Sequence, residues 1–186
     1  MSRGSVRVRR SSKETKVSVD LTLRGSGRFR GDLGDAFVTH LLETFVRYAG
    51  IDLTIAASGD DRHHVAEDVA HTLGRALRRA LPDAGVARFG EAIVPMDETL
   101  VLVALDLVER PYYRTDLPPA SMAEHVLRSL ATEAKLTFHE MTLRPGEDHH
   151  VFEATFKAFG LALTRAIEPS SRGLSLKGEV EWEESP

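Results

Sequence analysis

His63-His64-Val65-Ala66-Glu67 recurs 86 positions later as His149-His150-Val151-Phe152-Glu153. A lone histidine precedes each copy, His40 by 23 residues and His125 by 24 residues. Because the two lone histidines are themselves 85 residues apart, the two halves of the chain align almost without gaps. Self-similarity at a fixed interval is typical of a duplicated unit, so these segments predict a fold of two related halves.

The patterns of apolar residues repeat in the same order in both halves. Alternation of apolar and polar residues predicts strands over 17–23, 51–55, 88–94, 100–108 and 136–143. Apolar residues at helical spacing predict helices over 33–48, 63–81, 121–133 and 148–167. This order predicts an α+β fold of duplicated half-domains, each a mixed sheet of about four strands with two helices on one face.

Length and composition limit the classes of protein to which the chain can belong. With 186 residues, 42% of them apolar, the chain is expected to form one compact body. The net charge of −4 gives no reason to expect nucleic-acid binding. No apolar run is long enough to cross a membrane, and no secretory signal is recognisable, so a cytoplasmic protein is expected.

Four segments are expected along the chain. Residues 1–13, which are rich in arginine, are predicted to form a flexible basic N-terminus. The first repeat half is assigned to 14–85 and the second to 86–178. Residues 179–186 are expected to form an acidic C-terminal tail.

The duplicated motif supplies ligands of the kind that bind a divalent metal ion. The chain has no cysteine, so only nitrogen and oxygen atoms can hold the metal. Adjacent residues of a helix point about 100° apart, so His63 and His64 are expected to serve two different ions. Either histidine can share a helix face with Glu67. His40 and His125 are expected to complete the sites from other helices, or across a subunit boundary. One such motif alone is usually a solvated helix start, whereas two copies in register favour metal binding.

Three nearby residues are interpreted differently. His71 and His139 lie outside the repeated pattern and are expected to be structural or surface histidines. Asp68 is expected to support the start of its helix, or to hold a ligand histidine from behind, rather than to bind metal.

Taken together, these segments resemble the imidazoleglycerol-phosphate dehydratase family of histidine biosynthesis. The resemblance extends from Lys13 to Gly178, and the family has the same internal duplication. It implies a fold like that of ribosomal protein S5 domain 2. The segments that carry it include Thr39-His40-Leu41-Leu42, His63-His64-Val65-Ala66-Glu67-Asp68, Arg88-Phe89-Gly90, Val94-Pro95-Met96-Asp97-Glu98, Arg110-Pro111-Tyr112 and Asp148-His149-His150-Val151-Phe152-Glu153.

The resemblance implies a metal-dependent hydro-lyase that removes water from imidazole glycerol phosphate to give imidazole acetol phosphate. It implies two Mn²⁺ ions per subunit, which stabilise an imidazolate or diazafulvene intermediate of the substrate. It also implies a homo-oligomer, a 24-mer with active sites at the subunit interfaces. The metal ligands that it implies are His40, His63, His64, Glu67, His125, His149, His150 and Glu153.

The resemblance further implies which residues act on the substrate. Glutamates are the expected acid or base groups, and guanidinium and ammonium groups are expected on the substrate phosphate. The implied catalytic residues are Glu14, Glu67 and Glu153. The implied substrate-binding residues are Glu14, Arg88, Arg110, Lys157, Ser175 and Lys177.

Two departures from the family pattern leave an alternative open. Thr39 stands where the family usually has aspartate, and the loop before His63 is shorter than usual. A carboxylate that could support a ligand histidine is therefore missing at one position. The alternative is a divergent non-catalytic relative in which the metals only hold the oligomer together.

Overall fold

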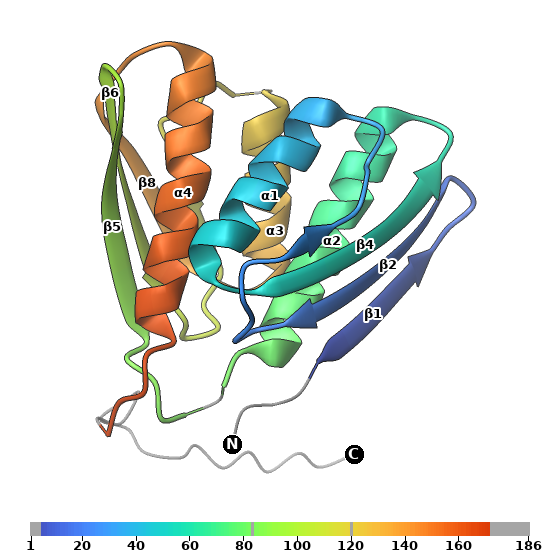
Figure 1. The fold of residues 1–186 in the computed structure, drawn as a ribbon, viewed down its shortest axis with the longest axis horizontal. Helices are drawn as coiled ribbons and strands as arrows, with labels where there is room; N and C mark the ends of the chain where they lie inside the picture. Colours follow the sequence, from blue (N-terminus) through green and yellow to red (C-terminus); the bar gives the residue numbers. More distant parts are fainter. Residues whose placement is uncertain (1–4, 83, 120, 172–186) are drawn as a thin grey trace, which may run out of the picture.

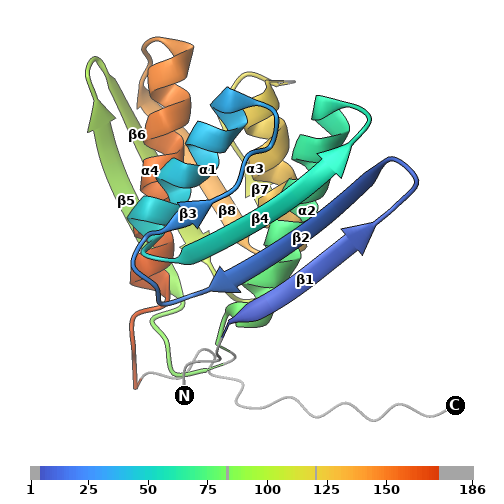
Figure 2. The same ribbon diagram turned by 45° about the vertical axis from the view of Figure 1, so that its right-hand side comes forward.

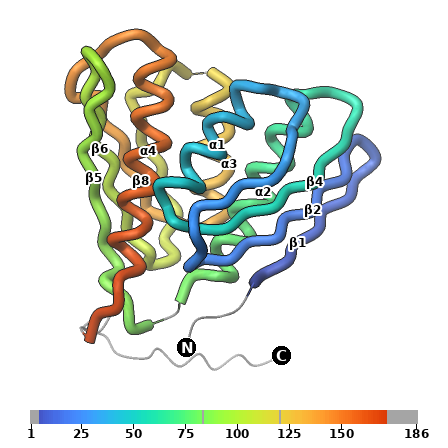
Figure 3. Tube along the Cα trace, in the orientation of Figure 1, coloured from blue at the N-terminus to red at the C-terminus, as the bar shows by residue number. Residues whose placement is uncertain are grey.

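The computed structural model describes residues 5–82, 84–119 and 121–171. Two four-stranded sheets enclose a layer of four helices (Figure 1). The tube trace shows the same three layers without the ribbon (Figure 3). Apolar side chains from both sheets and all four helices form one shared core, so the two halves are not separate domains.

The two sheets have the same topology, which confirms the predicted duplicated α+β fold. In each sheet the first two strands form an antiparallel hairpin, the next long strand is antiparallel to the second, and a short strand pairs parallel at the far edge. The spatial order in the first sheet is β1 (Val6–Ser11), β2 (Thr15–Thr22), β4 (Asp52–Gly59) and β3 (Phe29–Arg30). The order in the second sheet is β5 (Phe89–Met96), β6 (Thr99–Asp106), β8 (Thr137–Arg144) and β7 (Tyr112–Arg114).

The four predicted helices are all present, with ends that differ by a few residues at most. They are α1 (Ala36–Ala49), α2 (Arg62–Ala80), α3 (Met122–Glu133) and α4 (Asp148–Ala166). Asp35 caps α1 by accepting from two backbone N–H groups, and Asp61 caps α2 in a similar way. Gly50 ends α1 with a φ of 62°, a conformation that favours glycine.

The helices pack in pairs that join one half of the chain to the other. α1 packs against α4, and α2 packs against α3 (Figure 2). Gly74 and Gly160, which are 86 residues apart, allow this close approach. A Cβ on Gly74 would lie 2.5 Å from the carbonyl oxygen of Leu130, and one on Gly160 would lie 2.7 Å from the backbone nitrogen of Ala49. A larger side chain at either position would therefore separate the helices.

The flexible N-terminus expected over 1–13 is corrected for Val6–Ser11. Val6–Ser11 form a regular strand that pairs with β2 along its whole length, and Val8 is buried. The alternation of valine with arginine is a strand pattern, but the high charge of the segment concealed it. The expected tail over 179–186 lies outside the described residues. Within the described part of the chain, no helix combines the length and apolar character needed to cross a membrane.

Candidate metal centre

All four helices begin at the same end of the molecule, the upper end in Figure 1. Four of the six histidines of the repeated pattern therefore lie at this end, in two pairs. His63 and His149 lie at the start of α2 and α4, and His40 and His125 lie near the start of α1 and α3. Because each helix pair crosses between the halves, a histidine of one half meets the motif of the other half.

The first cluster consists of His63, Glu67 and His125. Their ligand atoms lie within 4.8 Å of one another. Nε2 of His125 lies 3.6 Å from Oε2 of Glu67, and the rings of His63 and His125 stack with centroids 4.8 Å apart. Nε2 of His125 is buried and has no hydrogen-bond partner in the described structure. A buried nitrogen without a partner is costly, and a bound cation would satisfy it.

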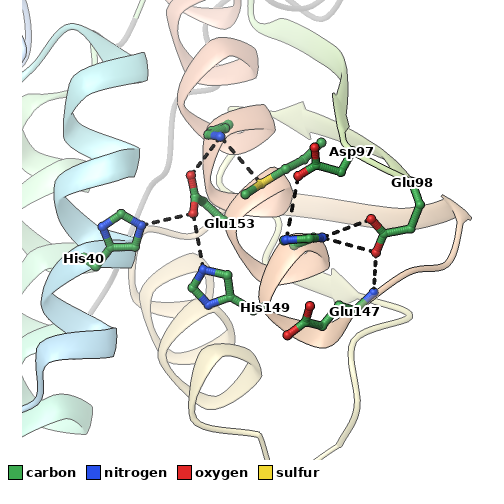
Figure 4. A network of polar contacts seen from close by, with 9 residues as sticks. His40, Asp97, Glu98, Glu147, His149 and Glu153 are labelled. Carbon is green, nitrogen blue, oxygen red and sulfur yellow. Dashed lines mark hydrogen bonds and ion pairs between the residues drawn. The ribbon is translucent and has the colours of Figure 1, made fainter.

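The second cluster consists of His40, His149 and Glu153 (Figure 4). Oε2 of Glu153 lies 3.1 Å from Nε2 of His40 and 3.6 Å from Nε2 of His149. The two imidazole rings are nearly parallel, with centroids 6.4 Å apart. Nζ of Lys157 lies 2.8 Å from the other carboxylate oxygen. Burial opposes the ionisation of Glu153, but Lys157 and His40 outweigh it and lower the pKa of the carboxyl.

The two clusters are equivalent in the duplicated fold, with one difference. The sequence left open whether the first or the second histidine of each motif shares a face with the glutamate. Both clusters use the first histidine, four residues before the glutamate. One helical turn after the glutamate, α2 has His71 whereas α4 has Lys157. The carboxylate of the second cluster is therefore paired with an ammonium group, and that of the first is not.

His64 and His150 do not join either cluster within one chain. Nδ1 of His64 lies 3.2 Å from Oδ1 of Asp60, and Nδ1 of His150 lies 3.0 Å from Oε2 of Glu98. Hydrogen bonds to these carboxylates raise the pKa of both imidazoles. Adjacent histidines thus point to different surroundings, as helical geometry predicts. Their role as metal ligands stays a prediction.

Glu98 is a site residue that the sequence reasoning missed, although a signal was present. Glu98 lies 84 residues after Glu14, close to the repeat interval, and both residues precede the second strand of a hairpin. The carbonyl oxygen of Glu14 accepts a hydrogen bond of 3.2 Å from the backbone N–H of Asp60. The charge of Glu14 also raises the pKa of His64, after the larger effect of Asp60. Glu14 therefore lies at the same end of the molecule as the first cluster.

Asp68 joins α2 to the first sheet. Its Oδ1 lies 2.9 Å from Nη2 of Arg10, and its other oxygen accepts a hydrogen bond from the hydroxyl of Thr15. Thr72 Oγ1 donates to the backbone carbonyl of Asp68 at 2.6 Å. No contact between Asp68 and a histidine is found in the described residues, so its carboxylate anchors the helix to two strands.

The two histidines outside the pattern have different surroundings. Nε2 of His71 lies 3.6 Å from Oε1 of Glu67, so His71 borders the first cluster. His139 is exposed on β8, where its ring packs against that of Tyr112 at 5.2 Å. His139 is thus a surface residue, as expected, whereas His71 is closer to the site than its place in the sequence indicates.

Thr39 acts on the start of α1. Its hydroxyl donates to the carbonyl of Asp35 at 2.7 Å and accepts from the backbone N–H of Leu33 at 3.4 Å. The residue therefore stabilises the helix that carries His40.

The expected phosphate-binding residues lie far apart in one chain. The backbone N–H of Arg88 donates to the carbonyl of Ala166 at 2.9 Å, at the end of α4 opposite the clusters. A helix of 19 residues is about 28 Å long, so Arg88 cannot reach the clusters of its own chain. Its guanidinium donates two hydrogen bonds to Asp106, of 2.6 and 2.9 Å, which raise its pKa. Arg110 also lies at this end, since its carbonyl accepts from Thr137 at the start of β8.

Lys157 is the one expected phosphate ligand that the described structure places beside a cluster. Besides its pairing with Glu153, it contacts the sulfur of Met96 at 3.6 Å and the face of the Tyr48 ring at 6.0 Å. Ser175 and Lys177 lie outside the described residues.

Each cluster offers two imidazoles and one carboxylate from two helices. This donor set suits a divalent transition metal, and three protein ligands leave coordination positions for substrate. A fold that brings two such clusters together by duplication defines a protein with a duplicated metal-binding site.

Comparison with known proteins assigns the chain to a family. The family model for imidazoleglycerol-phosphate dehydratase matches residues 34–163, and the chain belongs to this family. Members of this family are metal-dependent hydro-lyases of histidine biosynthesis. The chain is therefore an enzyme of this class.

Relatives and solved structures agree with this assignment over nearly the whole chain. The imidazoleglycerol-phosphate dehydratase of Heliobacterium modesticaldum is 42% identical, with 91% of this chain and 95% of the relative covered. That of Pyrobaculum aerophilum is 45% identical, with 91% and 96% covered. A crystal structure of the Pyrococcus furiosus protein superimposes with a TM-score of 0.82 at 37% identity, over 93% of this chain and 100% of that one.

Proposed function

We propose that this chain converts imidazole glycerol phosphate to imidazole acetol phosphate with two Mn²⁺ ions per subunit. The observation that carries the proposal is the pair of crossed clusters, each with two histidines and a glutamate. Bound there, two divalent ions would polarise the nitrogens of the substrate's imidazole and offset negative charge on the ring. A cytoplasmic location is part of this proposal, because the family acts in amino-acid biosynthesis.

The substrate explains why the ring must be held. The proton to be removed from the glycerol chain is not next to a carbonyl, so no enolate can form. Electrons of the imidazole ring instead expel the hydroxyl group, which leaves as water after protonation, and the substrate passes through a diazafulvene-like state. The electrons of the broken C–H bond then form a new carbon–carbon double bond and return charge to the ring, which makes the position of the ring decisive.

A carboxylate is the proposed proton acceptor. Glu153 is engaged by Lys157 and His40, which favours a ligand role for it in this chain. Glu67 is held at longer distances of 3.6 Å by His71 and His125. Glu14 is exposed on the turn beside Asp60 and is free to approach a substrate at the first cluster. We therefore keep Glu14, Glu67 and Glu153 as the catalytic set, with Glu14 as the first candidate for acid or base.

The positions of the basic residues support a site shared between subunits. Arg88 and Arg110 lie at the end of the helix layer opposite the clusters. A substrate of this size cannot contact both ends of one chain. If these arginines bind its phosphate, they belong to a different subunit from the clusters. His64 and His150 point away from the clusters of their own chain. They would likewise complete the coordination of metal ions bound by a neighbouring subunit.

An exposed apolar face supports the assembly that such sharing needs. Phe89, Ile93, Met141 and Leu143 are 59, 56, 51 and 42% exposed on the outer face of the second sheet. The outer face of the first sheet is polar or small-residue along β2 and β4. A patch of large apolar residues on one of two equivalent sheets favours contact with another copy. The proposed assembly is the 24-mer, with substrate at the subunit interfaces.

The test is turnover of imidazole glycerol phosphate by the purified protein with added Mn²⁺, with metal content and oligomer mass measured on the same sample. The expected result is Mn²⁺-dependent formation of imidazole acetol phosphate. A protein that holds two ions per chain but neither binds nor converts the substrate would contradict the proposal. If chelation also dissolved its oligomer, the non-catalytic alternative would replace it.

A further inference from the structure

We propose that the first half of the chain carries a second binding site, for a small phosphate-bearing anion, in a pocket between β1 and α2. The pocket has a volume of about 530 Å³, which lies within the usual range of small-molecule sites, about 300–1,000 Å³. It is lined by Arg7, Val8, Arg9, Arg10, His71, Thr72, Arg75, Arg79 and Glu133. Arginine is thus the main lining residue, in a chain whose net charge is −4.

The cationic groups come from two elements that lie side by side. β1 is the edge strand of the first sheet, and α2 packs against it (Figure 2). His71, Arg75 and Arg79 follow one another at four-residue intervals and share one stripe of the helix. Arg79 already has an interaction of its own, so Arg75 is the arginine of this stripe that is open to a bound anion.

Part of the positive charge in the pocket has no counter-charge. Arg7 and Arg10 are each paired with an aspartate. Arg75, in contrast, makes no hydrogen bond or ion pair with any described residue. Nδ1 of His71 is buried at the pocket wall without a hydrogen-bond partner. These groups are available to a ligand.

Glu133 does not neutralise this wall. Its Oε1 lies 3.5 Å from Nδ1 of His71, but the contact does not meet the geometry of a hydrogen bond. Glu133 is the one acidic side chain among the lining residues, so the balance of charge in the pocket remains positive.

The second half provides an internal comparison. There the equivalent edge strand, β5, packs directly against α4, and a Cβ on Gly90 would lie 2.0 Å from the carbonyl oxygen of Ala162. Leu161 stands 86 residues after Arg75. The duplicated fold therefore does not require an open, arginine-lined space at this place. The arginine at position 75 of the pocket wall is thus not repeated in the second half.

The chemistry of the pocket favours phosphate over other anions. A guanidinium donates paired hydrogen bonds that match the oxygens of a phosphate group. The volume exceeds what one phosphate ion fills, so the ligand is assigned an organic part as well. His71 touches both this pocket and Glu67 of the first cluster, so a bound anion would lie next to the metal centre without sharing its ligands.

The test is isothermal titration calorimetry of the metal-loaded full chain with AMP, with adenosine and inorganic phosphate as parallel titrants. We expect AMP to bind and adenosine not to bind. The double variant Arg75→Gln/Arg79→Gln should weaken AMP binding about tenfold or more, because it removes charge-assisted hydrogen bonds. Arg78→Gln is the matched control. It is on the same helix and makes a similar change in charge, but Arg78 pairs with Glu109 outside the pocket.

Thermal melting and turnover of imidazole glycerol phosphate show whether the variants remain folded. Both are expected to be unchanged in the double variant, so binding is read independently of the proposed function. Inorganic phosphate binding as tightly as AMP would support the anion site but overturn the assignment of an organic part to its ligand. Failure of millimolar AMP to bind, or equal weakening by Arg78→Gln, would overturn the proposal.

Discussion

Oε2 of Glu98 lies 3.0 Å from Nδ1 of His150, across 52 positions of sequence. Oε1 of the same carboxylate accepts a hydrogen bond of 2.6 Å from the backbone N–H of Glu147, just before α4. The Glu147 N–H contributes most to lowering the pKa of Glu98, to about 2. Glu98 therefore holds the start of α4 and fixes the orientation of a predicted metal ligand.

Glu98→Gln is expected to weaken Mn²⁺ binding about 10- to 100-fold, the usual effect of losing a carboxylate that orients a ligand histidine. The measurement is metal content after dialysis against buffered Mn²⁺, with melting curves to show that the variant is folded. Glu91→Gln is the control, because Glu91 is exposed on the same hairpin and its nearest charged partner is Arg165. Unchanged Mn²⁺ affinity in Glu98→Gln would remove His150 from the ligand set.

Glu67→Gln and Glu153→Gln should each remove one of the two proposed ions and lower kcat at least about 100-fold. Each glutamate is the carboxylate of one cluster, and an amide is a poorer ligand for Mn²⁺. Metal counting by elemental analysis and steady-state turnover check the two parts. Glu43→Gln, at an exposed position of α1, is the control. Two ions retained in either cluster variant would show that the clusters are not the metal sites.

Asp52 should give stability that depends on pH. Its carboxylate accepts hydrogen bonds from the side chain and backbone of Arg28 and from the backbone N–H of Ser26. The Arg28 side chain contributes most to lowering its pKa. Because the folded-state pKa is depressed, the stabilisation is complete above the unfolded value of about 3.9 and is lost as the pH falls through the folded value.

Asp52→Asn is therefore expected to lower the urea midpoint at neutral pH, and the difference from the parent should shrink as the pH falls below about 4. Urea unfolding at a series of pH values measures this difference. Glu43→Gln again serves as the control, since its side chain is exposed. A difference that stays constant down to the lowest pH would show that the Asp52 charge does not stabilise the fold.

The sequence predicted the fold well because a repeated motif and the spacing of apolar residues can both be read directly from the chain. The 86-residue interval between His63 and His149 predicted two equivalent halves, and all four helices followed from helical spacing. Strand β1 was missed because its arginines dominated its composition, although Val8 faces the core. The short strands β3 and β7 were missed because segments of two and three residues carry no period.

The site was predicted only in part, because ligand sets depend on which helices pack together. Spacing alone left His63 and His64 as alternatives, and the packing of α2 on α3 decides for His63. The close packing of helices from different halves depends on Gly74 and its equivalent Gly160. The sequence does not show which helix each of these glycines contacts. Glu98 could have been found, since it repeats Glu14 at nearly the same interval as the histidines.

Mixing two inactive variants would test whether the site is shared between subunits. Arg110→Ala removes an exposed residue at the end of the layer opposite the clusters, and Glu67→Gln disables the first cluster. In a shared site, some interfaces of a mixed oligomer would combine an intact cluster from one subunit with an intact Arg110 from another. Activity should then rise well above that of either variant alone.

The experiment requires that the subunits exchange, so the variants are dissociated by chelation, mixed, and reassembled with Mn²⁺. Reassembly is followed by light scattering, and each variant taken through the same cycle alone is the control. In the geometry of one chain, α4 separates Arg88 and its neighbourhood from the clusters by about 28 Å. Recovery of activity on mixing would mean that this gap is closed by a second subunit. Full reassembly without recovery would contradict a site shared between subunits.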